Sequence, residues 1–362
     1  MRSLKIALTG NVFPFGAGHS YGGERILGYL TQALVKLGHE VYLFAREGTN
    51  VPEATDYIPV GSLTNERDVH YEAAKEYFAA AGFDPDLYFC GYFGEGWDPD
   101  ILNRFPYVEL VWNAWCHMWW QLRQKPFNVV TYSRTLQDDL RRQNGIDTTM
   151  IHYGLPKDLY AFQPKKESYA CWIGKIESGK APHIGIELAK AAGVKLVIMS
   201  PPYNTGTFWN EVCPYIDNKT VFWVRGVDDA MKYEIMSKAK CLIYTNNNQW
   251  KEHFGIVLAE ALAMGTPVVA MNRPGNDCSV VKDRIIEDGK QGFVLSYRDS
   301  NNLIEILDVG VPLIRKIHEI DPVACREHFE KRFTADLMAR RYEWLFNQVI
   351  QGKRFDSVEV PI

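Results

Sequence analysis

The chain has 362 residues, of which 46% are hydrophobic and 23% charged, values that are ordinary for a globular protein. This length fits about two domains of ~150 residues each. The net charge of −4 argues against a protein whose main partner is nucleic acid, and it leaves room for a local basic groove that binds a phosphorylated ligand.

The seven cysteines are scattered, odd in number and without a Cys-x-x-Cys pair, so neither a disulfide framework nor a zinc site is indicated. This usage fits a reducing cytosol. The first apolar run, residues 6–8, is too short for a signal peptide and is typical of a strand. No window approaches ~18 uninterrupted apolar residues, so we expect no transmembrane helix. We therefore expect a cytoplasmic protein, and peripheral attachment to the inner face of a membrane is left open.

In chain order, the first half alternates short apolar strands with amphipathic helices. The predicted strands are residues 4–9, 41–45, 87–90, 107–112 and 129–132, and the predicted helices are 22–37, 69–81 and 135–143. Gly38 stands where the C-cap of the first helix is expected. This alternation is typical of a parallel, doubly wound sheet.

The second half repeats the alternation after a segment rich in Pro and Lys, residues 155–168, which we predict to be a linker. The predicted strands are residues 169–173, 195–199, 220–224, 241–244, 267–270 and 293–295, and the predicted helices are 184–192, 229–239, 254–264, 301–307 and 335–351. The fold class is therefore α/β, with Rossmann-like domains at 1–160 and 168–330 and a C-terminal helical segment at 331–362. Ligands of such domains bind at the carboxyl ends of the strands.

The first stretch that carries chemistry is the Gly-rich loop of residues 10–23, between the first strand and the first helix. Glycine lets backbone N–H groups approach a phosphate, and a helix N-terminus favours negative charge. Gly16 and Gly18 resemble the start of a dinucleotide fingerprint, but the third glycine has the wrong spacing. A loop that merely needs turns is the structural alternative.

The second stretch, residues 172–182, follows the first predicted strand of the second domain. Its two lysines, Lys175 and Lys180, flank a tight turn. Lysines from both ends of such a turn can converge on one diphosphate, each as a flexible point charge. The alternative is a pair of solvated lysines on a surface loop.

The third stretch, residues 252–269, places Glu252 just before a predicted helix and Glu260 two turns into it. The free N–H groups at the start of that helix are expected to face the cleft. Glu260 has apolar neighbours, so a solvated face does not explain it, and the two hydroxyls of a ribose would be one partner for it. For Glu252, helix capping alone is the usual interpretation.

This third stretch, EHFG-x4-E-A-x-A-x-G-x-PVV, resembles the E-x7-E signature of retaining GT-B glycosyltransferases, above all those of glycosyltransferase family 4. The stretches from Gly22 to Val41 and from Gly174 to Pro182 resemble other motifs of that family. The resemblance covers about residues 4–350. It implies a GT-B fold with two parallel sheets that face a central cleft, an N-terminal acceptor domain, a C-terminal nucleotide-sugar domain and a final helix that crosses back.

The resemblance also implies roles for single residues. His117 and Glu252 would contact the donor sugar, Lys175 and Lys180 would neutralise the leaving diphosphate, and Glu260 would hold the ribose diol. The other donor-binding residues implied are Gly18, Tyr21, Gly22, Gly174, Arg225, Gly226, Val227, His253, Phe254, Gly255 and Ile256. A satisfied core histidine is the alternative for His117. No metal-binding cluster is evident, so we expect metal-independent transfer.

The function implied is a retaining transferase that moves a hexosyl-type group from a UDP-sugar or GDP-sugar to a hydroxyl of a glycan, a lipid-linked or a small-molecule acceptor. We expect no cofactor, no nucleic-acid partner, and a monomer or homodimer. The alternatives are a GT-B sugar-nucleotide epimerase or hydrolase, a nicotinamide-dependent dehydrogenase, and a non-catalytic sugar-nucleotide-binding module. Three departures from the family pattern leave donor and acceptor open: Lys175 replaces the usual Arg, His152-Tyr153 replaces Pro-Asn, and residues 272–282 lack GG-x-PE.

Overall fold

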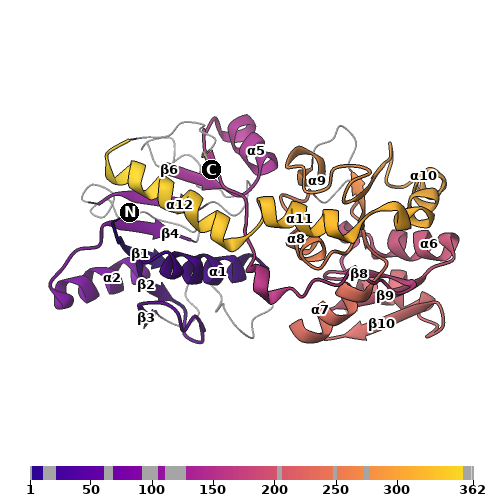
Figure 1. Cartoon of the computed structure of the whole chain (residues 1–362), viewed down its shortest axis with the longest axis horizontal. Helices are drawn as coiled ribbons and strands as arrows, with labels where there is room; N and C mark the ends of the chain where they lie inside the picture. Colours follow the sequence, from indigo (N-terminus) through magenta and orange to yellow (C-terminus); the bar gives the residue numbers. More distant parts are fainter. Residues whose placement is uncertain are drawn as a thin grey trace. The chain divides into compact units, whose positions relative to one another are not determined.

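The computed structural model describes residues 2–10, 22–60, 68–91, 105–110, 128–201, 206–247, 251–272, 278–353 and 360. The chain forms two units, drawn in Figure 1. One consists of Met1–Pro156 together with Phe333–Ile362, and the other of Lys157–Arg332. The polypeptide therefore passes from one unit to the other twice.

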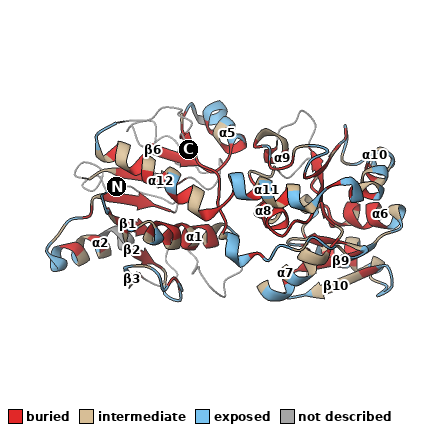
Figure 2. Cartoon of the chain, in the orientation of Figure 1, coloured by how far each residue is buried: buried red, intermediate tan, exposed pale blue. Residues whose placement is uncertain are grey.

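The first unit is built on a seven-stranded parallel sheet in the order β3-β2-β1-β4-β5-β6-β7. Its strands are β1 (Lys5–Thr9), β2 (Glu40–Ala45), β3 (Asp56–Pro59), β4 (Leu87–Cys90), β5 (Tyr107–Leu110), β6 (Asn128–Thr131) and β7 (Thr149–Met150). Its helices are α1 (Gly22–Lys36), α2 (Asp68–Ala81), α5 (Arg134–Asn144) and α12 (Ala335–Ile350). Apart from the half-exposed edge strand β3, the strands are short, largely buried runs because helices cover the sheet, as Figure 2 shows in red.

The final helix, α12, belongs to this first unit although it follows the whole second unit in sequence. It lies against α1, and its Tyr342 and Phe346 rings pack 5.2 and 5.6 Å from the ring of Phe89 on β4. Glu343 Oε1 on α12 also lies 3.4 Å from Nε2 of the buried His39, whose pKa is lowered by burial. The predicted return of the C-terminal helix is therefore confirmed.

The second unit is built on a six-stranded parallel sheet in the order β10-β9-β8-β11-β12-β13. Its strands are β8 (Tyr169–Ile173), β9 (Lys195–Ser200), β10 (Val221–Arg225), β11 (Cys241–Tyr244), β12 (Val268–Asn272) and β13 (Gly292–Ser296). Its helices are α6 (Pro182–Ala192), α7 (Asp229–Lys238), α8 (Ile256–Ala263), α9 (Ser279–Lys282), α10 (Leu303–Arg315) and α11 (Pro322–Arg332). The strand order reverses between β8 and β11, and open α/β sheets bind ligands at such a switch point.

The two chain segments that connect the units are hydrogen-bonded to each other within each unit. Within the first unit, the Leu155 amide donates to the Phe333 carbonyl over 2.8 Å, and the Ala335 amide donates to the Leu155 carbonyl over 2.9 Å. Within the second unit, the Arg326 guanidinium on α11 donates to the carbonyl oxygens of Tyr160 and Lys157 over 2.8 and 3.3 Å. Each unit thus holds its own ends of the two crossings by hydrogen bonds.

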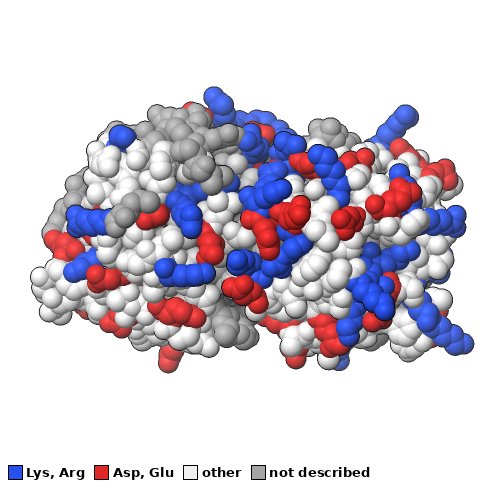
Figure 3. All heavy atoms as spheres, viewed as in Figure 1, with Lys and Arg blue, Asp and Glu red and all other residues white. Residues whose placement is uncertain are grey.

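On the face drawn in Figure 3, lysines and arginines alternate with acidic side chains and do not form one large field of a single sign. Among the described helices, none is both long and apolar enough to cross a lipid bilayer.

Candidate active site

Two loops at the switch point of the second unit are joined by hydrogen bonds. Thr245, directly after β11, places its Oγ1 2.7 Å from the carbonyl oxygen of Lys180, and this Oγ1 accepts from Trp172 Nε1 over 2.8 Å. Asn247 donates from its amide N–H to the Gly179 carbonyl over 3.0 Å and from its side chain to the Ser178 carbonyl over 2.9 Å. The lysine loop after β8 and the loop after β11 therefore form one rigid edge.

At this edge, Lys180 and Glu252 form an ion pair. Lys180 Nζ lies 2.6 Å from Glu252 Oε2, and the Tyr244 hydroxyl donates to the same oxygen over 2.5 Å. Both charged side chains are largely shielded, with 20% of Lys180 and 17% of Glu252 exposed. The sequence predicted both residues as site residues, and the structure brings them into direct contact.

The electrostatics keep Glu252 ionised. Burial by itself would raise the pKa of Glu252, but the charge and hydrogen bond of Lys180 and the hydrogen bond of Tyr244 outweigh it and lower the pKa to about 2. Burial and the Glu252 carboxylate together raise the pKa of Tyr244 well above its ordinary value. At neutral pH, Glu252 can therefore accept hydrogen bonds from hydroxyl groups but cannot serve as a proton donor.

This lowered pKa gives the fold a stability that depends on pH. Ionised Glu252 stabilises the folded state above its ordinary pKa of 4.5, and this contribution is lost as the pH falls towards about 2. We expect the difference in unfolding free energy between the wild type and Glu252→Gln to shrink by about 3 kcal/mol across this window. Guanidinium denaturation of both proteins at neutral pH and at several pH values between 4.5 and about 2 measures this difference. A difference in unfolding free energy that does not change with pH would contradict the prediction.

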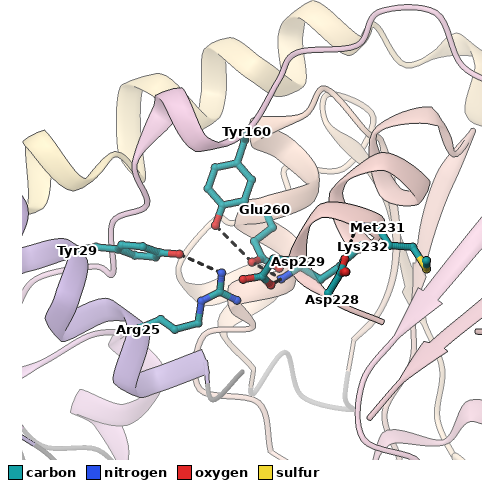
Figure 4. A network of polar contacts seen from close by, with 8 residues as sticks. All are labelled: Arg25, Tyr29, Tyr160, Asp228, Asp229, Met231, Lys232 and Glu260. Atoms are coloured by element: carbon teal, nitrogen blue, oxygen red, sulfur yellow. Dashed lines mark hydrogen bonds and ion pairs between the residues drawn. The ribbon is translucent and has the colours of Figure 1, made fainter. Parts of the chain in front are cut away.

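The second acidic residue, Glu260, lies on α8 with only 4% of its surface exposed. Its Oε1 accepts from Lys232 Nζ over 2.9 Å and from the Tyr160 hydroxyl over 3.3 Å, as Figure 4 shows. The sequence predicted that Glu260 needs a partner, but it did not identify Lys232 or Tyr160 as that partner. Helix α7, which carries Lys232, has no clear apolar stripe, so its spacing does not mark which residues face inward.

The start of α8 depends on Gly255, which has a φ of 75°. A Cβ at this position would lie 2.9 Å from Leu258 Cδ1, so both the backbone angle and the close packing favour glycine. The preceding Phe254 is buried, and the helix begins at Ile256, two residues later than predicted. The turn directs the helix N-terminus, with its favourable field for anions, towards the loop that carries Glu252.

The remaining predicted residues of the second unit lie at the same carboxyl edge of the sheet. Gly174 follows β8 and donates to the Met199 carbonyl over 3.2 Å, while Lys175 next to it is exposed. Arg225 ends β10 and is exposed, and Gly226 follows with a φ of 65°. Val227 continues the loop after β10, and His253 follows Glu252 in the loop between β11 and α8. Arg225 to Val227 follow the outermost strand, β10, two strands away from β8.

Four predicted residues belong to the first unit. Gly22 is the first residue of α1 and is exposed. His117, Gly18 and Tyr21 lie outside the described residues. Among the residues that the structure describes, no group of three or more His, Cys, Asp or Glu side chains could hold a metal ion.

Comparisons with known proteins find similarity to glycosyltransferases. Residues 162–309 match the model of the family described as glycosyl transferases group 1. The chain is 28% identical over 142 residues to alpha-1,3/1,6-mannosyltransferase alg-2 of Neurospora crassa, which covers 38% of this chain and 27% of that protein. It is 35% identical over 120 residues to the phosphatidyl-myo-inositol mannosyltransferase of Mycobacterium leprae, which covers 33% and 26%. The chain thus spans about a quarter of the length of these relatives.

The similarity to solved structures extends over nearly the whole chain. The Anabaena protein Alr3699/HepE, crystallised in complex with UDP and glucose, has a TM-score of 0.66 and 15% identity, with coverage of 95% of this chain and 100% of that chain. Such a likeness establishes the fold and confirms the predicted pair of Rossmann-like units. The chain therefore has the two-unit α/β fold of GT-B glycosyltransferases, and its residues 162–309 match the glycosyl transferases group 1 family.

Proposed function

We propose that the chain is a retaining glycosyltransferase that moves a hexosyl group from a nucleoside-diphosphate sugar to an acceptor hydroxyl without a metal ion. The observation that carries this proposal is the Lys180–Glu252 ion pair, which lies beside the start of α8 and within the segment that matches the group 1 family. A fixed cation and a helix N-terminus at one edge of a parallel sheet suit a diphosphate. We assign donor binding to the second unit and acceptor binding to the first.

Catalysis then depends mainly on positioning and electrostatics. The bond between the anomeric carbon and the diphosphate oxygen breaks, and its electron pair stays on the diphosphate. The acceptor oxygen forms a bond to the same face of the anomeric carbon, and its proton passes to an oxygen of the leaving diphosphate. Lys180, Lys175 and the N-terminus of α8 stabilise the negative charge that grows on the leaving group.

The two acidic residues act as hydrogen-bond acceptors in this proposal. Glu252 is ionised at neutral pH, so it accepts hydrogen bonds from hydroxyl groups of the donor sugar. Glu260, which is buried on α8, accepts from the hydroxyls of the ribose. Neither residue has to carry a proton during transfer.

The relatives support a hexose as the group transferred. The proteins of Neurospora crassa and Mycobacterium leprae are mannosyltransferases by name, and the Anabaena structure contains UDP and glucose. GDP-mannose and UDP-glucose are therefore the donors to test first. Retention is read from the anomeric proton of the product by NMR.

We expect one of UDP, GDP, ADP and dTDP to raise the thermal midpoint far more than the others. A ligand that binds only the folded state at 100 times its Kd adds about 2.7 kcal/mol, which corresponds to roughly 5–10 °C for a unit of this size. A thermal-shift panel, followed by turnover of the matching nucleotide sugar, measures this. If none of the four nucleotides raised the thermal midpoint, the proposal would be rejected. Binding of a nucleotide without turnover of its sugar on any acceptor would favour a non-catalytic binding module.

A further inference from the structure

The polar network around Glu260 joins three elements of the second unit (Figure 4). Lys232 comes from α7, Glu260 from α8, and Tyr160 from the segment that enters the unit. Lys232 is 8% exposed, Glu260 4% and Tyr160 1%, so the polar groups meet inside the protein. The ammonium and the hydroxyl both donate to Glu260 Oε1, over 2.9 and 3.3 Å.

Stability alone does not explain this arrangement. A buried ion pair loses hydration on both partners, and well-packed apolar residues of similar volume are often as stable or more stable. The position of the network suggests a role in ligand binding instead. Asp228 caps α7 by accepting from the Met231 amide over 2.8 Å, which fixes the turn that leads into Lys232. Helices α7 and α8 both begin at the carboxyl edge of the sheet, where the proposed donor binds.

The charges of the network favour a ligand that donates hydrogen bonds. Lys232 Nζ also lies 3.4 Å from Asp229 Oδ1, and 44% of the Asp229 side chain is exposed. One cation between two carboxylates leaves these three side chains with one net negative charge. The carboxylate oxygens accept hydrogen bonds from hydroxyl groups, whereas the Lys180 edge suits the diphosphate.

We propose that Lys232 is a positioning residue that, together with Tyr160, holds the Glu260 carboxylate in the orientation needed to accept hydrogen bonds from the ribose hydroxyls of the donor. The inference rests on the proposed function and extends it to Lys232 and Tyr160, which lie outside the E-x7-E stretch. Lys232 acts through Glu260 and touches no reacting atom.

The test compares ribonucleotides with their 2′-deoxy forms. UDP, GDP and ADP, each with its 2′-deoxy counterpart, are titrated calorimetrically into the wild type, Lys232→Met and Lys232→Arg. We expect Lys232→Met to weaken binding of the preferred ribonucleotide by about 10-fold or more and to leave the 2′-deoxy form within about 3-fold of its wild-type affinity. Lys232→Arg keeps a cation at the carboxylate and should retain most of the preference for ribose.

Two further variants test whether weaker binding results from misfolding of Lys232→Met. Lys232→Met combined with Glu260→Gln removes both charges, so no buried carboxylate is left without its ammonium. Tyr160→Phe removes only the hydroxyl. Both should reduce the preference for ribose while the thermal midpoint stays close to that of the wild type.

Four results would overturn this inference without overturning the proposed function. Equal weakening for the ribose and 2′-deoxy forms would assign Lys232 a purely structural role, and unchanged affinities for both forms would assign it none. Tighter binding in Lys232→Met would make Lys232 a competitor of the ribose. A wild type that binds nucleoside diphosphates without a preference for ribose would also overturn it, while leaving the Lys180 edge intact. A wild type that binds no nucleoside diphosphate would overturn the proposed function itself.

Discussion

Replacing Lys180 with alanine is expected to lower kcat for sugar transfer by about 100- to 1,000-fold, the range found when one charge-stabilising donor is removed from an active site. Lys180 Nζ lies 2.6 Å from Glu252 and is largely shielded from water. Its attraction to the diphosphate is therefore screened less than in bulk water, and water cannot fully compensate for its removal. The effect should fall on kcat and kcat/KM together, because the charge on the diphosphate grows only in the transition state. Steady-state kinetics with the cognate donor measure it.

Two controls accompany this variant. Lys195→Ala removes an exposed lysine from the first residue of β9, at the opposite end of the same sheet, and should leave kcat unchanged. Lys180→Ala combined with Glu252→Gln avoids an unpaired carboxylate and separates loss of the cation from disturbance of its partner. Normal turnover in folded Lys180→Ala would rule out the assignment of this lysine to the leaving group.

Replacing Gly292 with alanine is expected to destabilise the protein by about 3 kcal/mol or more, through overpacking rather than through a strained backbone angle. Gly292 opens β13 opposite Val268 on β12. An added Cβ would lie 1.9 Å from the Val268 carbonyl oxygen and 2.8 Å from the Val268 amide nitrogen, which are backbone atoms of a fully buried strand. The strands would have to separate, and the thermal midpoint should fall by roughly 6–12 °C.

Gly206→Ala is the matched control for this substitution. A Cβ at Gly206 would meet no atom within 4 Å, and its backbone angle does not require glycine. We expect a change within about 0.5 kcal/mol. Calorimetric or fluorescence melting of both variants provides the comparison, and equal midpoints would show that β12 and β13 can move apart at little cost.

The fold was largely predictable because most strands are continuous apolar runs between turn signals. β11 is found where it was predicted, at Cys241–Tyr244, and β1 differs by one residue. The edge strand β3, Asp56–Pro59, was missed because it is half-exposed and has no apolar run. Helix α10 continues well past its predicted end at residue 307, through Pro312, which reads as a helix breaker in sequence.

The candidate site was predictable only in part. Lys180, Glu252 and Glu260 each stand in a local context that marks them: a tight turn, a helix start and an acid among apolar neighbours. Their partners could not be found in this way. Tyr160 reaches Glu260 across 100 residues of sequence, and Lys232 reaches it from a helix without a clear inward face. Such contacts follow from the strand order, which a local pattern does not contain.

The double crossing has a consequence for how this protein can be divided and how its halves can be exchanged. Residues 157–332 form a continuous insertion in a first unit that is itself split, so one proteolytic cut in either crossing leaves the two halves linked by the other. Leu155 and Phe333 are joined by a hydrogen bond, so the two junctions of the insertion are neighbours in space. Recombination at these two points would transplant the Lys180–Glu252 pair and the Glu260 network as one cassette and leave the host unit's own sheet and α12 intact.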